Sequence, residues 1–269
     1  MKIEAGQVAV VTGGTSGIGF GLAAILARRG VNVMIADVRE DAIPAAVDAL
    51  SRQPGRVVGV HADVSIDADV DALADETIER FGRVDLVCNN AGVVCEMAPM
   101  WEQRSETWRW LIDVKMMGVV HGVRTFAPLF IAAGSGHFLN TASAGGLMPL
   151  PTLAPYNATM HAVVGLTETL DAELKAVSDQ LGATVLCPAL VDTPLGRNSA
   201  GLVPPGAAAT PAEGDADAMR GAISPAVVAE AAIAAIEAGR VHAVVGPGAD
   251  FAAKERVKER VKDLLADLD

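Results

Sequence analysis

The sequence predicts a single-domain α/β fold, a doubly wound parallel sheet of about seven strands with helices on both faces. Two patterns lead to this expectation. Short runs of β-branched residues alternate along the chain with longer segments of helical periodicity. A glycine-rich turn joins the first strand pattern to the first helix pattern. Hydrophobic residues make up 51% of the 269 positions, enough for one large core, and no linker or repeat divides residues 1–269.

The expected strands and helices follow each other in simple alternation. Strands are expected near 7–12, 32–36, 56–60, 84–88, 136–141, 183–187 and 242–246. Helices are expected at 17–29, 40–51, 67–81, 103–127, 155–176 and 225–238. The stretch 194–222 is rich in Ala, Gly and Pro and lacks periodicity, so it is either a disordered segment or, as we favour, a substrate lid. Apolar residues at helical spacing predict an amphipathic C-terminal helix at about 251–268.

Charge and cysteine usage limit the possible partners. The net charge of −12 argues against nucleic acid, whose phosphates would be repelled. The chain opens without a basic and apolar leader, and no apolar run approaches membrane-spanning length, so we expect no membrane partner and a cytoplasmic location. Cys88, Cys95 and Cys187 form no CxxC pair and are expected to be reduced core residues. No metal site is predicted.

The first strand-to-helix turn carries the main binding signal. Gly13, Gly17 and Gly19 lack Cβ, so the backbone can turn tightly and lie close to a ligand. The free N–H groups at the start of the next helix favour a pyrophosphate, as in a Rossmann dinucleotide site. Thr15, Ser16 and Ile18 belong to the same turn and are candidate contacts. The alternative is that these glycines serve only the geometry of the turn.

Acidic residues at the ends of the second and third strands indicate which nucleotide is bound. Asp37 follows the glycine turn by about twenty residues, where a carboxylate can accept both ribose hydroxyls and repel a 2′-phosphate. Its alternative role is a helix N-cap. Arg39 weakens the discrimination because it could pair with a phosphate, but NAD is favoured over NADP. Asp63 and Val64 lie at the same sheet edge and could contact the adenine.

These motifs resemble those of the classical short-chain dehydrogenases/reductases over nearly the whole chain. Besides the glycine turn and Asp37, the resemblance rests on the segments Asn89–Gly92 and Pro188–Thr193, and on Ser143 followed by Tyr156 thirteen residues later. It implies contacts with the cofactor from Asn90, Ala91, Gly92, Tyr156, Pro188, Val191 and Thr193, with the segment of Pro188 and Thr193 at the nicotinamide amide. It also implies that Ser143 positions a substrate carbonyl and that Tyr156 passes a proton while hydride moves at nicotinamide C4. Ala189 stands where a glycine is more usual.

Two positions depart from the family pattern. The family has a lysine four residues after the catalytic tyrosine, and this sequence has Met160 there. The family has an asparagine in the preceding long helix, and this sequence has Lys115 there. In the family the lysine binds the nicotinamide ribose and lowers the pKa of the tyrosine. Without it, Tyr156 should hold its proton too tightly to act as a base near neutral pH.

The position of Lys115 suggests a compensation. Trp108, Ile112, Lys115, Val119, Val123 and Phe126 form one stripe of the expected helix, so the lysine lies on an apolar face. It could snorkel from a partly exposed edge, or its amine could occupy the space left at residue 160. Met160 is on the same face as Tyr156 and is most simply a core residue. Deliberate substitution at these positions is a further alternative.

Two classes of function are therefore open. The first is an oxidoreductase that interconverts a secondary alcohol and a ketone with NAD(P), with Ser143, Tyr156 and Lys115 as the catalytic residues. The second is a silent nucleotide-binding scaffold. Retention of Ser143 and Tyr156 favours the enzyme. Few charges in the lid indicate a small, mostly apolar alcohol or ketone as substrate. The family's packing of the two long helices implies a homo-oligomer, a dimer or a tetramer.

Overall fold

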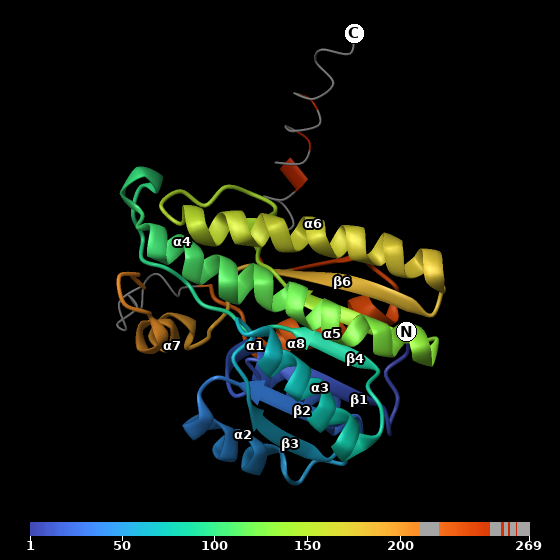
Figure 1. Cartoon of the computed structure of the whole chain (residues 1–269). Helices are drawn as coiled ribbons and strands as arrows, with labels where there is room; N and C mark the ends of the chain where they lie inside the picture. Colours follow the sequence, from blue (N-terminus) through green and yellow to red (C-terminus); the bar gives the residue numbers. More distant parts are fainter. Residues whose placement is uncertain (210–220, 248–253, 256–257, 259–261, 263–269) are drawn as a thin grey trace.

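The computed structural model describes residues 1–209, 221–247, 254–255, 258 and 262. Within this part of the chain, seven parallel strands form one sheet, as the sequence predicted (Figure 1). Their order in the sheet is β3-β2-β1-β4-β5-β6-β7. The strands are β1 (Val8–Thr12), β2 (Asn32–Asp37), β3 (Val57–His61), β4 (Leu86–Asn89), β5 (Gly136–Thr141), β6 (Leu181–Pro188) and β7 (His242–Val245). Each lies within two residues of its expected ends.

Helices cover both faces of the sheet (Figure 1). The principal ones are α1 (Gly17–Arg28), α2 (Ile43–Leu50), α3 (Asp67–Phe81), α4 (Ser105–Leu111), α5 (Gly118–Ala133), α6 (Ala154–Val177), α7 (Leu195–Leu202) and α8 (Pro225–Glu237). One core joins α1, α2 and α8 to the sheet, and a second joins α3, α5 and α6 to its other face. Neighbouring β1 residues alternate between the two cores, since Ala9 and Val11 belong to the first and Val10 to the second.

The strand order places a binding crevice at the carboxyl end of β1. Strand β1 pairs with β2 on one side and with β4 on the other. From β2 the chain continues outward to β3, and from β4 it continues to β5 in the opposite direction across the sheet. Ligands of open α/β sheets bind at such a switch point. The glycine turn that follows β1 lies there, which brings it close to the end of β4.

The long helix expected at 103–127 is interrupted. Helix α4 leads into a π-helical segment, η3 (Ile112–Met117), before α5 begins at Gly118. Single π turns inside α-helices change the face that each later residue presents. Trp110 and Leu111, which the predicted stripe omits, are buried before this segment, while Trp108 and Ile112 of the stripe are partly buried. Lys115 is buried, as the stripe predicted.

The combined helix Ser105–Ala133 contradicts the expectation that no apolar run approaches membrane-spanning length. By length and composition alone this 29-residue helix is long and apolar enough to cross a membrane, since an 18-residue window of it has a mean hydropathy of 1.4. Its inner face packs against the sheet through Phe126 and Phe130, which are almost completely buried. The apolar composition therefore serves the core on one side, while Ile131 on the other side is 46% exposed.

The last two expected segments differ in outcome. The stretch 194–222 begins with helix α7, which its composition did not predict, and residues 210–220 lie outside the described residues. The amphipathic helix expected at about 251–268, with Val257, Val261, Leu264, Leu265 and Leu268, also falls largely outside them. Cys88, Cys95 and Cys187 are all buried, as expected of core residues.

Candidate active site

The glycine turn is built by close backbone contacts. Gly13 has a φ of 63°, a left-handed conformation that glycine adopts without strain. A Cβ at Gly19 would meet the carbonyl oxygen of Gly13 and would lie 2.6 Å from Nδ2 of Asn90. The Thr12 hydroxyl accepts hydrogen bonds from the backbone N–H groups of Asn90 (2.9 Å) and Ala91 (3.1 Å). These contacts tie the turn to the segment after β4, so at least Gly19 serves the geometry of the turn itself.

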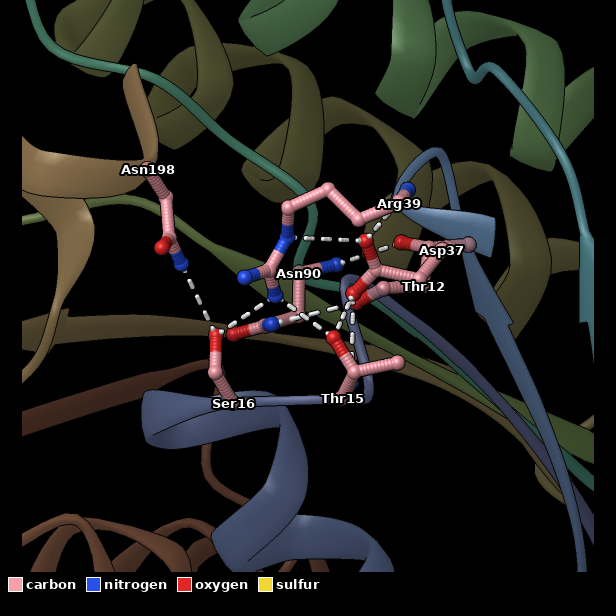
Figure 2. A network of polar contacts seen from close by, with 7 residues as sticks. All are labelled: Thr12, Thr15, Ser16, Asp37, Arg39, Asn90 and Asn198. Carbon is pink, nitrogen blue, oxygen red and sulfur yellow. Dashed lines mark hydrogen bonds and ion pairs between the residues drawn. The ribbon is translucent and has the colours of Figure 1, made fainter. Parts of the chain in front are cut away.

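A polar network surrounds Asp37 beside this turn (Figure 2). One carboxylate oxygen accepts hydrogen bonds from the backbone N–H (3.2 Å) and the hydroxyl (2.5 Å) of Thr15. The other accepts from the backbone N–H of Arg39 at 3.0 Å and lies 3.4 Å from its Nε. Asp37 is thus buried and caps no helix, which removes the N-cap alternative. Through its bonds to Thr15, the carboxylate faces the glycine turn.

Arg39 and Asn198 complete the network from two distant segments. The guanidinium donates to the hydroxyls of Thr15 (2.5 Å) and Ser16 (3.1 Å). The amide of Asn198, on α7, donates to the same Ser16 oxygen at 3.2 Å (Figure 2). No pattern in the sequence indicated Asn198, because it lies in a stretch without periodicity or a motif. It is the polar residue by which α7 reaches the glycine turn.

Asp63 is engaged in local bonding at the end of β3. Its carboxylate accepts hydrogen bonds from the backbone N–H (2.9 Å) and the hydroxyl (2.7 Å) of Ser65. The carbonyl of Val64 lies 2.9 Å from Nδ1 of His121 on α5. Both residues still line the same cavity as Asp37. Their position fits the predicted contact with a nucleotide base.

Ser143 and Tyr156 meet across the turn after β5. Ser143 precedes a 3₁₀ turn and accepts the backbone N–H of Gly145 at 3.1 Å. The Asn157 amide, on α6, donates to the carbonyls of Gly145 and Met148, which fixes this turn against the start of the helix. Burial raises the pKa of the Tyr156 phenol above its ordinary value, and its hydrogen bond with Ser143 partly opposes that rise.

Lys115 lies beside Tyr156, and Met160 does not reach the cavity. The amine of Lys115 is 5.7 Å from the centroid of the Tyr156 ring, and a Cβ at Gly92 would collide with it. Burial lowers the pKa of Lys115 to about 8. Met160 is fully buried in the apolar cluster that contains Val163 and Val185. The cation at this end of the cavity therefore comes from η3 and not from α6.

One cavity of about 860 Å³ connects these groups. The sequence-predicted residues that line it are Gly13, Ser16, Gly17, Ile18, Asp37, Arg39, Asp63, Val64, Asn90, Ala91, Gly92, Lys115, Ser143, Tyr156, Pro188, Val191 and Thr193. Thr15 and Gly19 do not line it, because Thr15 bonds to Asp37 behind the wall and Gly19 packs inside the turn. The sequence missed a group of mostly apolar lining residues, namely Trp110, Val114, Met148, Leu150, Leu153 and Asn198.

Comparison with known proteins decides the family. The model of the short chain dehydrogenase family matches residues 7–201. The chain belongs to the short-chain dehydrogenase family. The dehydrogenase is 38% identical over 201 residues to 1-deoxy-11-beta-hydroxypentalenate dehydrogenase of Streptomyces avermitilis, a match that covers 74% of this chain and 73% of the relative. It is 33% identical to cyclohexanol dehydrogenase of Acinetobacter sp., over 70% of this chain and 74% of the relative.

A solved structure extends the similarity to the whole fold. The short chain dehydrogenase/reductase of Burkholderia phymatum, solved in complex with NAD, superposes with a TM-score of 0.85 and is 34% identical. The alignment covers 100% of this chain and 96% of that one. Together with the alcohol dehydrogenases above, these similarities make the dehydrogenase an oxidoreductase that acts on CH–OH groups or the corresponding carbonyls.

Proposed function

We propose that this enzyme transfers hydride between a nicotinamide cofactor, NAD in preference to NADP, and a small, mostly apolar secondary alcohol or ketone. The observation that carries the proposal is the single cavity that joins the glycine turn and Asp37 to Ser143, Tyr156 and Lys115. The residues fit such a cofactor, because the turn offers backbone N–H groups at the start of α1 and the buried carboxylate offers acceptors to a ribose. The bound cofactor supplies or accepts the hydride.

Ser143 and Tyr156 handle the substrate oxygen in this proposal. The Ser143 side chain is close enough to lower the pKa of the Tyr156 phenol, and both residues line the cavity, so both can reach one carbonyl oxygen. In the reductive direction Ser143 holds that oxygen, and Tyr156 gives it a proton as the carbon receives hydride. In the oxidative direction the tyrosinate takes the proton back, which requires a stabilised phenolate because burial alone opposes ionisation.

Lys115 supplies the stabilising charge. Residue 160 cannot do so, since Met160 is apolar and lies outside the cavity wall. An ammonium whose nitrogen lies 5.7 Å from the centroid of the Tyr156 ring would attract the negative charge of a tyrosinate. Such a charge would oppose the rise in the phenol pKa that burial causes. The lysine therefore has the charge and the place to restore the proton relay.

The cofactor preference rests on Asp37. A 2′-phosphate would meet its carboxylate, which lies at the cavity wall. Arg39 reduces this repulsion, since its guanidinium already contacts Thr15 and Ser16 at the same place. NAD is nevertheless favoured, because the Arg39 side chain is paired with Asp37 and is not a free cation.

Three further features belong to the same proposal. The start of the 194–222 stretch is a substrate lid, supported by Leu195 and Leu202 of α7 in the cavity wall. The enzyme is a homo-oligomer, a dimer or tetramer, supported by the exposed apolar side chains Ile131 on α5 and Leu166 on α6. The reduced, buried cysteines fit a cytoplasmic location.

The alternative function is a silent nucleotide-binding scaffold, and Met160 at the position of the family's lysine favours it. The deciding experiment measures NADH oxidation at neutral pH with a panel of apolar cyclic and open-chain ketones. The enzyme reading predicts turnover that Tyr156→Phe and Lys115→Met abolish to a similar extent. NADH binding without turnover on any ketone, with the same result for both variants, would establish the scaffold instead.

A further inference from the structure

Lys115 differs from every other lysine of the chain in its surroundings. The chain has six lysines, and the other five are exposed. Lys175, for example, pairs with Asp171 at 2.6 Å on the surface of α6. Lys115 is only 6% exposed, and among the described residues its amine has no hydrogen bond or ion pair. The small remaining exposure faces the cavity.

The surroundings of this amine are apolar and close. Its aliphatic stem and Nζ fill the space over Gly92, and the Tyr156 ring lies on another side. An apolar cluster continues the wall around that tyrosine, with Val93, Trp110, Val114 and Leu153 as members. A buried amine without a counter-charge is driven toward its neutral form, which carries a lone pair. A neutral amine open to an apolar cavity is a nucleophile.

We propose that Lys115 captures small apolar aldehydes and unhindered ketones in this cavity as covalent imines. The lone pair of Nζ attacks the carbonyl carbon, and the electron pair of the C=O bond moves to oxygen, which takes a proton. The carbinolamine then loses that oxygen as water, with both hydrogens of the amine leaving nitrogen overall. A carbon–nitrogen double bond replaces the carbon–oxygen double bond, and nothing is oxidised or reduced.

The neighbouring hydroxyls assist this exchange. Ser143 and Tyr156 line the same cavity and are both neutral donors, since burial keeps the phenol protonated. They can donate hydrogen bonds to the carbonyl oxygen under attack and to the hydroxyl that departs as water. The reaction uses the cavity of the proposed dehydrogenase but requires no nicotinamide, so the two proposals can fail independently.

The lysines should differ in reactivity because they differ in the fraction of side-chain amine that is neutral at a given pH. With a pKa of about 8, about a tenth of the Lys115 amines are neutral at pH 7, against about one in three thousand for an exposed lysine of pKa 10.5. A less basic amine is also a weaker nucleophile, so the full ratio is not expected in the rate. We expect Lys115 to react at least about tenfold faster than any other lysine.

The test incubates the purified full-length protein, without nicotinamide, with benzaldehyde or cyclohexanone and sodium cyanoborohydride, which reduces imines to stable amines. Peptide mass spectrometry then compares the occupancy of all six lysines within one wild-type sample, so the result does not depend on the folding of a variant. In the native protein, Lys115 should carry more adduct than any of the other five lysines, and in urea all six lysines should be labelled equally. The adduct on the α-amino group of Met1 is counted separately. Lys115→Arg keeps the cation but forms no imine, and it should show surface labelling only. Equal labelling of Lys115 and the exposed lysines in the native protein would overturn the proposal.

Discussion

Replacing Lys115 by methionine should stabilise the protein, and the gain should depend on pH. The native amine has a pKa of about 8, while the same amine in the unfolded chain has a pKa near 10.5. Below pH 8 the Lys115 amine is protonated in both the folded and the unfolded state, so the full cost of burying an ammonium is subtracted from the free energy of unfolding. The difference between 10.5 and about 8, at about 1.4 kcal/mol per pH unit, makes that cost about 3 kcal/mol. As pH rises from about 8 to 10.5 the unfolded state alone holds the proton, so the cost declines and then vanishes.

Thermal unfolding of wild type and Lys115→Met at pH 7 and pH 9.5 measures this directly. About 3 kcal/mol corresponds to about 6–12 °C in Tm for a chain of this size at pH 7. At pH 9.5 about 1.4 kcal/mol of this stability difference should remain, so the difference in Tm between the two proteins should fall by about half. Other titrating groups are common to both proteins and cancel in the comparison. Lys175→Met, which removes an exposed amine paired with Asp171, is the control and should give no gain at either pH. Equal melting temperatures at pH 7, or a gap unchanged at pH 9.5, would refute the reasoning.

Three further predictions concern the cofactor, the relay and the assembly. In a titration followed by nicotinamide fluorescence, NADH should bind more tightly than NADPH. Asp37→Ser should reduce the ratio of the two dissociation constants about tenfold, because it frees Arg39 for the 2′-phosphate. Equal affinities in the wild type would contradict this prediction. Lys115→Met should lower the rate of NADH oxidation at least about a hundredfold, and Met160→Lys alone should not raise that rate. The double variant Lys115→Asn with Met160→Lys should be active. Full turnover by Lys115→Met would rule out the proposal that Lys115 replaces the family's lysine. Light scattering at micromolar concentration should give the mass of a dimer or tetramer, and the mass of one chain would exclude the interface over α5 and α6.

The sheet was predictable because its strands are short runs of β-branched residues, and the segments between them repeat apolar residues at the spacing of an α-helix. Asp37 and the glycine turn were predictable for a related reason, since a fixed distance along the chain places both at the same sheet edge. The position of Lys115 on the buried face was also predictable from the helical period. In these cases local pattern and global fold agree.

The errors have a common physical cause. The π-helical segment Ile112–Met117 interrupts the helix without a signal in its composition, so a regular period carried across it misses the burial of Trp110 and Leu111. Asn198 reaches Ser16 across 182 positions of sequence, a contact that no local pattern encodes. Helix α7 was missed because Gly196 and Gly201 make its eight residues poor in helix formers. Such features depend on tertiary packing.

Tyr156, partly buried between Ser143 and Lys115, is the one tyrosine in the sequence. The ultraviolet absorbance change that accompanies phenol ionisation therefore comes from the reacting group alone, with no surface tyrosines to subtract. Isotopic labelling of tyrosine would place a single ring signal in a nuclear magnetic resonance spectrum for the same reason. Comparing that signal in wild type and Lys115→Met would measure how strongly the buried amine acts on the phenol, before any substrate is known.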